Sequence, residues 1–186
     1  MDWHVFNESE YALVQKTSTF KTAELICKNY GHGGHLVDIR SVDEQKFIEH
    51  LISNISQVNR SSDDSDQFWI GSRKSPYNSN LYIWIVNEHV IFDIDIIYSN
   101  WYPKEPDLST TDDLCVYLSI EPCKYQRYKP ICADFFGKWR SCDCQKLKQS
   151  ICKRLVSNHF ENSSLISTSL FIAMVLVNMS IYIKFF

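Results

Sequence analysis

Two stretches in the first third of the chain carry the hydrophobic spacing of amphipathic helices. In the first, apolar residues recur at three- and four-residue intervals, at Phe20, Ala23, Ile26, Cys27 and Tyr30. Thr19 stands before this run, where it can cap the helix, and Gly31 stands after it, where a helix commonly ends. The pattern predicts a helix between Thr19 and Gly31, with Cys27 facing the core.

The second stretch opens with Ser41-Val42-Asp43-Glu44, which has the form of a capping box. Apolar residues then follow on one helical face, at Phe47, Ile48, Leu51 and Ile52. The spacing predicts a second helix with a buried stripe. After it, the polar run from Asn59 to Asp66 predicts a solvated loop.

From there to about residue 153, aromatic and β-branched runs alternate with turn residues, which is typical of strands. The predicted strands are Gln67 to Gly71, Leu81 to Val86, Val90 to Tyr98, Leu114 to Ile120, Lys138 to Cys144 and Ser150 to Lys153. Helices followed by strands in one unit indicate an α+β fold with a mainly antiparallel sheet.

The segment from Leu165 to Phe186 is nearly free of charge. As a helix it would be about 33 Å long, enough to cross a bilayer core. Three interpretations fit it: a retained membrane span, a lipid-anchor signal, or a buried C-terminal helix. The first two attach the protein to a membrane through this hydrophobic segment (165–186), with residues 155–164 as a polar stalk. Because no signal peptide follows Met1, we expect the chain to be a fragment or an incomplete reading of a longer precursor.

Charge and cysteine content narrow the class of protein. A formal net charge of −3 and a pI near 6.0 give no basic surface for nucleic acid. The 7 cysteines fall mostly in the C-terminal half, and their close pair, Cys142 and Cys144, lacks the spacing of a zinc site. A disulfide framework explains them better and predicts a secreted protein or one on the extracellular face of the plasma membrane. Glycosylation sequons agree with a secretory route; they begin at Asn7, Asn54, Asn59 and Asn162.

An ordered series of short motifs runs through the chain. Its members are Phe20-Lys21-Thr22-Ala23 with Cys27, Leu36 to Ser41, Trp69-Ile70-Gly71, Trp84, Tyr98-Ser99-Asn100-Trp101, Glu105-Pro106-Asp107, Asp113 to Val116, and Gly137-Lys138-Trp139 before Cys144 and Cys152. No single motif is specific, but the whole set in this order is hard to obtain by chance. Over residues 1–154 the chain resembles the C-type lectin-like domain family. The resemblance implies two helices, antiparallel sheets and a long loop region, stapled by disulfides.

The resemblance also implies how four cysteines pair. It joins Cys27 to Cys152 and Cys115 to Cys144. Of the remaining three, Cys123 and Cys132 flank a polar insert and could bridge a hairpin. That pairing would leave Cys142 unpaired or available to another chain.

In sugar-binding members, the resemblance implies, calcium is held by a Glu-Pro-Asn tripeptide, an acidic residue two before a cysteine, and an Asn-Asp pair after a tryptophan. Glu105, Asp107 and Asp113 match the first half of this ligand set, and Pro106 matches the family's cis-proline. Arg140 and Ser141 stand where Asn-Asp is expected. Because calcium needs about six to eight oxygen ligands, we expect at most weak Ca²⁺ binding by the three carboxylates.

Two hypotheses concern the source of positive charge beside these carboxylates. In one, the Arg140 guanidinium supplies part of the charge of calcium by pairing with Glu105 or Asp107. In the other, Asp112 and Asp143 join Asp113 in a rearranged weak cation site. The candidate ligand-binding residues are therefore Glu105, Asp107, Asp113, Arg140 and Ser141.

The implied function is extracellular carbohydrate binding with weak or absent calcium dependence. The alternative is a calcium-independent receptor of the same fold for a cell-surface protein ligand. Enzyme function is not expected, because no hydrolase or phosphate-binding motif is present. The one tempting cluster, His32-Gly33-Gly34-His35, is more typical of a turn than of a metal site.

Overall fold

Strands precede, separate and follow the two helices. The computed structural model describes residues 1–31, 33–56, 67–78, 80–86, 89–91, 98–109, 113–120, 125–126, 129–130 and 136–156. The elements are β1 (His4–Phe6), β2 (Ser9–Ser18), α1 (Phe20–Asn29), β3 (His35–Leu36), α2 (Val42–Ser56), β4 (Gln67–Lys74), β5 (Tyr82–Val86), β6 (His89–Ile91), β7 (Leu114–Ser119), β8 (Tyr125–Gln126), β9 (Lys129–Pro130), β10 (Lys138–Asp143) and β11 (Lys148–Leu155).

Both helices form where the hydrophobic spacing predicts them. The Thr19 hydroxyl accepts the Thr22 backbone N–H at 3.4 Å, and Tyr30 is the C-cap that follows α1. At the start of α2 the Ser41 hydroxyl accepts the Glu44 N–H at 3.1 Å, as a capping box requires. The capping residues and apolar stripes are local signals, which explains why the sequence locates both helices.

The strand prediction is incomplete at the N-terminus, because β1 and β2 come before the first helix. They form a hairpin in which Phe6 is opposite Ser9. Its turn includes Asn7 with a φ of 52°, a left-handed conformation that asparagine tolerates. In β2 the apolar residues Tyr11 to Val14 are consecutive rather than alternating, because both faces of the strand are covered. A search for alternation therefore passes over this strand.

The predicted strand from Val90 to Tyr98 is also partly wrong. β6 ends at Ile91, and Tyr98 lies in a loop, while residues 92–97 lie outside the described part of the chain. Tyr98 packs its ring edge-on against Trp139 with the centroids 5.7 Å apart. A buried aromatic residue in a loop cannot be told from one in a strand by residue type alone, which explains why the prediction extended the strand to Tyr98.

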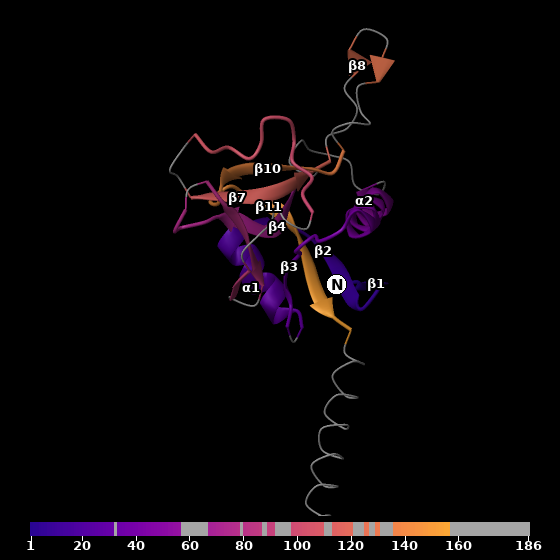
Figure 1. Cartoon of the computed structure of the whole chain (residues 1–186). Coiled ribbons are helices and arrows are strands. Elements are labelled where there is room, and N and C mark those ends of the chain that lie inside the picture. The colour runs from indigo at the N-terminus through magenta and orange to yellow at the C-terminus, as the bar shows by residue number, and fades with distance from the viewer. Residues whose placement is uncertain are drawn as a thin grey trace, which may run out of the picture. The chain divides into compact units, whose positions relative to one another are not determined.

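The sheet is mixed, with β4 near its centre (Figure 1). The main path runs β1-β2-β11-β4-β5-β6, while β7 joins β4 to β10 and β3 pairs with β11. β4 runs antiparallel to β5 and β7 and parallel to β11. An irregularity between Trp69 and Arg73 shifts the register of β4 against β7.

Side chains on opposite faces of the sheet enter two separate cores. In β7, Val116 and Leu118 pack in the core that contains the buried stripe of α2. Cys115 and Tyr117 point the other way, into the core that contains α1. The sheet is therefore covered by one helix on each face, and in Figure 1 α1 and α2 lie on either side of β11.

Both disulfides implied by the family resemblance are confirmed. Cys27 of α1 bonds Cys152 of β11, and Cys115 of β7 bonds Cys144 just after β10. Cys142 carries a free thiol. Cys123 and Cys132 lie outside the described residues, so their pairing stays a prediction.

A cluster of charged and polar side chains ties α2 to β2 and β11. Glu44 accepts hydrogen bonds from the Tyr11 hydroxyl and the Lys153 ammonium, both at 2.7 Å. Lys153 also pairs with Asp38 at 3.1 Å. The two ring nitrogens of His35 contact Gly33 O at 3.0 Å and Asp38 at 3.1 Å. His35 thus contacts the turn at Gly33 and the buried carboxylate of Asp38. His32 lies outside the described residues.

The hydrophobic segment 165–186 also lies outside the described residues. Within the described part, no helix has the length and apolar character of a membrane span.

Candidate ligand-binding site

The loop that carries the Glu105-Pro106-Asp107 tripeptide is fastened to β10. Trp139 N donates to Asn100 O at 2.8 Å, and Tyr102 N donates to Trp139 O at 2.9 Å. The ring of Trp101 meets that of Trp139 edge-on, with centroids 5.7 Å apart. These contacts place the tripeptide beside the middle of β10, where Arg140 and Ser141 lie.

The buried side chain of Gln45, on α2, forms hydrogen bonds with β10 and with the residue that precedes it. Trp139 Nε1 donates to Gln45 Oε1 at 3.0 Å, and Gln45 Nε2 donates to Gly137 O at 2.9 Å and to Glu49 Oε1 at 2.8 Å. Asn100 Nδ2 donates to the same carbonyl of Gly137 at 3.0 Å. Gln45 therefore links α2 to the strand and, through Gly137, to the loop.

The structure brings together Glu105, Asp107 and Ser141, three of the candidate ligand-binding residues. Glu105 Oε2 accepts the Ser141 hydroxyl at 2.5 Å and the Ser141 backbone N–H at 3.1 Å. The Asp107 backbone N–H donates to both Glu105 Oε2, at 3.2 Å, and Ser141 Oγ, at 3.1 Å. The Glu105–Pro106 peptide bond is cis, which confirms that expectation. Ser141 thus joins both ends of the tripeptide to β10.

The Asp107 carboxylate turns toward its own loop. Its Oδ1 accepts the Ser109 hydroxyl at 2.6 Å and the Ser109 backbone N–H at 2.8 Å. These two hydrogen bonds, and the positive charge of Lys74 on β4, lower the pKa of Asp107. The Tyr82 hydroxyl donates to the Asp107 carbonyl at 3.1 Å, and burial chiefly raises the pKa of Tyr82 to about 12.

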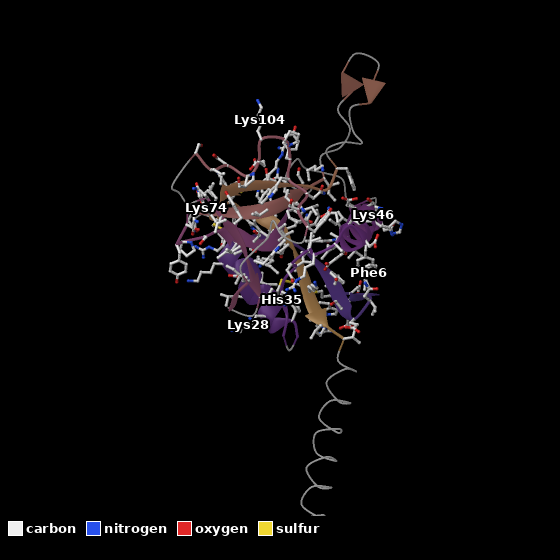
Figure 2. All side chains as sticks on the ribbon, in the orientation of Figure 1. Phe6, Lys28, His35, Lys46, Lys74 and Lys104 are labelled. Atoms are coloured by element: carbon white, nitrogen blue, oxygen red, sulfur yellow. A yellow bond between two sulfur atoms is a disulfide. The ribbon has the colours of Figure 1, made fainter. Side chains whose placement is uncertain are left out.

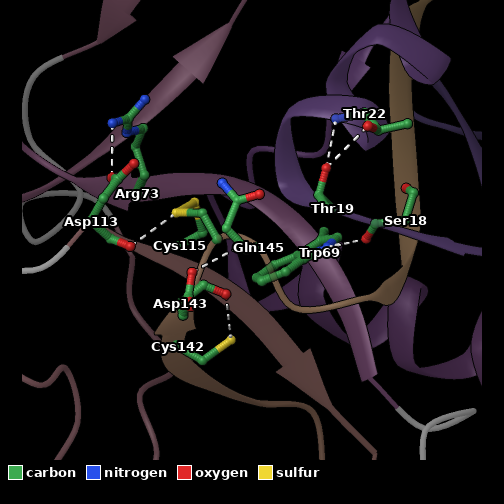
Figure 3. The surroundings of a disulfide bond; sticks show 11 residues. Ser18, Thr19, Thr22, Trp69, Arg73, Asp113, Cys115, Cys142, Asp143 and Gln145 are labelled. Carbon is green, nitrogen blue, oxygen red and sulfur yellow. Dashed lines mark hydrogen bonds and ion pairs between the residues drawn. A yellow bond between two sulfur atoms is a disulfide. The ribbon is translucent and has the colours of Figure 1, made fainter.

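Asp113 pairs with a residue that the sequence prediction missed. Arg73 Nη2 lies 2.8 Å from Asp113 Oδ1, and Figure 3 shows this ion pair beside the Cys115–Cys144 disulfide. Arg73 is opposite Cys115 in the pairing of β4 with β7, which explains why it reaches Asp113. One sequence signal could have identified Arg73: two cations, Arg73 and Lys74, stand side by side at the end of a strand whose other residues are mostly apolar.

Arg140 lies on β10 next to Ser141, with its guanidinium 3.8 Å from the centroid of the Tyr102 ring. Its charge also acts on Tyr117, where a hydrogen bond from Arg140 opposes the rise in the tyrosine pKa that burial causes. Its predicted pairing with Glu105 or Asp107 stays a prediction.

The residues present do not fit a calcium ion. Glu105 Oε2 already accepts hydrogen bonds from Ser141 and Asp107, and Asp113 is paired with Arg73. Among the residues that the structure describes, no group of three acidic, histidine or cysteine side chains could hold a metal. Asp143 accepts the Gln145 N–H at 2.8 Å within a turn, and Asp112 lies outside the described residues.

Cys142 lies between Ser141 and Asp143, and its thiol donates to Asp143 O at 3.6 Å (Figure 3). Burial is the main reason that the pKa of the thiol is raised to about 11. The group therefore stays protonated at neutral pH and is a poor nucleophile there.

A hydrogen-bonded turn near the site presents an exposed aromatic ring. Ser75 Oγ accepts the N–H groups of Tyr77 and Asn78 at 3.2 and 3.3 Å, and Ser75 N donates to Leu81 O at 2.8 Å. Tyr77 is 84% exposed, and Leu81 and Leu108 are also exposed. Tyr82, next to Leu81, bonds to Asp107, next to Leu108, so the turn and the tripeptide loop lie close together.

Two relatives are similar in sequence to this chain, one over most of its length and one over less than half. Human layilin is 31% identical over 141 residues, which cover 72% of this chain and 32% of layilin. Snaclec A14 from Macrovipera lebetinus is 34% identical over 79 residues, or 41% of this chain and 47% of the snaclec. The chain thus aligns with less than half the length of either relative.

Solved structures share the fold at low sequence identity. Human lithostathine matches with a TM-score of 0.61 and 21% identity, covering 83% of this chain and 88% of lithostathine. The C-type lectin domain of murine dendritic cell inhibitory receptor 2, solved with an N-glycan, matches with a TM-score of 0.59 and 20% identity, covering 83% and 97%. A calcium-independent type II antifreeze protein matches with a TM-score of 0.56 and 21% identity, covering 82% and 91%.

The two helices, the mixed sheet and the two disulfides agree with these likenesses. The sequence model described as "Lectin C-type domain" matches residues 16–154, which is most of the chain. The protein therefore belongs to the C-type lectin domain family.

Proposed function

We propose that residues 1–154 bind carbohydrate outside the cell with weak or absent calcium dependence. The observation that carries this proposal is the 2.5 Å hydrogen bond from Ser141 to Glu105, which holds the family's sugar-binding tripeptide in place through protein atoms. The Asp107 carboxylate and the Tyr102 ring beside Arg140 offer the hydrogen-bond acceptors and flat apolar surface that a sugar needs. Membership of a family of binding domains favours recognition over catalysis.

Two structural neighbours support the separate parts of this proposal. The murine receptor domain was solved with an N-glycan, and the antifreeze protein is described as calcium-independent. At this identity the likeness of both neighbours to the present chain is one of fold.

The first prediction concerns calcium and glycan retention. On a glycan array, we expect binding to change by less than about twofold between calcium and EDTA, because no metal has to bridge the sugar. Asp107→Ala should lower retention at least about tenfold, since it removes a charged hydrogen-bond acceptor. Asp2→Ala, which changes an exposed carboxylate near the N-terminus, is the matched control. Retention that requires calcium would contradict the proposal.

The second candidate is a receptor for a cell-surface protein, favoured by the exposed Tyr77 on its hydrogen-bonded turn. An exposed aromatic residue has few rotatable bonds to immobilise on binding and is a common anchor in protein interfaces. A blank glycan array, together with chelator-insensitive binding to a purified protein that Tyr77→Ala abolishes, would favour this candidate.

We further propose that the domain is displayed on the outer face of the plasma membrane, with residues 155–164 as the stalk and residues 165–186 as the attachment. The two disulfides favour an oxidising compartment. We expect cells that express the chain behind a signal peptide to keep it on their surface, whereas deletion of residues 165–186 should release it into the medium. Resistance to phosphatidylinositol-specific phospholipase C would indicate a retained span, and release by it a lipid anchor. Equal surface retention of the deleted chain would overturn the attachment.

A further inference from the structure

Three carboxylates lie within nine residues of one another in the chain, at Glu105, Asp107 and Asp113. Negative charges brought close together repel one another unless positive charge or hydrogen-bond donors compensate them. In the sugar-binding members of the family, as the resemblance implies, this compensation comes from calcium, which the residues present here do not fit. Positive charge or hydrogen-bond donors near these carboxylates therefore stabilise the loop region.

The end of β4 supplies two cations to this region. Arg73 pairs with Asp113 at 2.8 Å, and the charge of Lys74 lowers the pKa of Asp107. Lys74 is opposite Tyr82 in the pairing of β4 with β5, and the Tyr82 hydroxyl donates to the Asp107 carbonyl at 3.1 Å. The strand register thus places Lys74 beside the tripeptide loop. Figure 2 shows Lys74 and Lys104 on a different part of the domain from Lys28 and His35.

Lys74 is a buried cation, and its burial needs a compensating interaction. Only 4% of Lys74 is exposed. A buried ammonium group is costly unless a negative charge or hydrogen-bond acceptors lie near it. The Asp107 carboxylate is one negative charge that favours the buried ammonium, since the charge of Lys74 acts on the pKa of Asp107.

The third carboxylate, Glu105, is compensated by donors. Ser141 gives it both a hydroxyl and a backbone N–H, and the Asp107 N–H also reaches the same oxygen. Ser141 stands where the family has an acidic residue, which would repel Glu105 unless a metal lay between them. A serine at this position is therefore compatible with a closed loop that contains no metal.

We propose that Arg73 and Lys74 supply the positive charge that calcium supplies in sugar-binding members of the family, and that the Ser141 hydroxyl closes the tripeptide against β10. This inference deepens the proposed function, because it names what holds that same site in its binding shape. The positive charge comes here from two cations of β4, whereas the hypothesis drawn from the sequence placed it on Arg140. The order of residues 105–109 and of Asp113 then depends on ionic strength and on Arg73, and is insensitive to chelators.

Hydrogen exchange of residues 105–115, measured by mass spectrometry on the unmodified domain, tests this directly. We expect exchange in calcium and in EDTA to agree within about twofold. Raising NaCl from about 50 mM to 1 M should speed it at least about twofold, because salt screens the partly exposed Arg73–Asp113 pair. Arg73→Met should speed it at least about threefold at low salt, and Arg73→Lys should restore most of the protection.

Arg154→Met is the matched control, since it breaks a comparable ion pair with Glu10, 2.6 Å long, that does not involve the loop. It should leave exchange of residues 105–115 unchanged. Calcium that protects this segment at least about threefold, or Arg73→Met exchange equal to that of the unmodified domain, would overturn the inference. The measurement uses no ligand, so a blank glycan array can refute the proposed function without affecting this result.

Discussion

Replacing Cys27 and Cys152 together with serine is expected to lower the free energy of unfolding by about 4 to 5 kcal/mol. The bond spans 125 residues and joins α1 to β11, so in its absence the unfolded chain gains a large amount of conformational freedom. Both cysteines are fully buried, and two serine hydroxyls in the α1 core add a further cost. Urea denaturation of the oxidised protein, followed by tryptophan fluorescence, measures the difference.

The second disulfide provides the comparison. Cys115 and Cys144 are separated by only 29 residues, so the same double replacement should cost about 3.5 kcal/mol, roughly 1 kcal/mol less. Its cysteines are also buried, which keeps the packing change similar. A larger loss for the Cys115–Cys144 pair would show that loop length is not what determines the stabilisation here.

Gln45→Leu is expected to lower the free energy of unfolding by about 2 to 4 kcal/mol, although leucine is apolar and of similar size. The substitution leaves the buried Trp139 N–H without its acceptor and removes a donor from Gly137 O and Glu49. Unsatisfied buried polar groups cost more than a hydrogen bond contributes when it is made. Thermal or urea unfolding gives the loss of stability.

A double replacement separates the hydrogen bond from the packing. Trp139→Phe keeps an aromatic ring but removes the N–H that Gln45 accepts. If the bond causes the effect, the Gln45→Leu/Trp139→Phe variant should be at least about 1 kcal/mol more stable than the sum of the single losses predicts. Strict additivity would contradict this account of Gln45.

The parts of the fold that depend on local signals are predictable from the sequence. Thr19 and the Ser41–Glu44 box mark where the helices begin, and the apolar stripes mark which faces are buried. The two disulfides were also predicted, but only through the family resemblance, because spacing alone leaves many pairings open. The segments of β4, β5, β7, β10 and β11 followed from their aromatic and β-branched composition.

The features that were missed depend on contacts between distant parts of the chain. β2 is covered on both faces, so its apolar residues do not alternate, and Tyr98 packs on Trp139 from a loop. At the site, the sequence identified Glu105, Asp107 and Ser141, which do meet. It missed Arg73, because the pairing of Arg73 with Asp113 follows from the register of β4 against β7, which no local pattern contains.

The position of β11 constrains when the domain can fold during synthesis. This strand lies between β2 and β4 in the sheet, pairs with β3, and carries Cys152, although it is the last strand of the domain to be translated. Until residues 148–155 emerge from the ribosome, β2 and β4 lack the neighbour that joins them. Such distant pairings make folding slow and leave strand edges open to wrong partners in the meantime. Cys27 likewise has no partner for its native disulfide until Cys152 has been made.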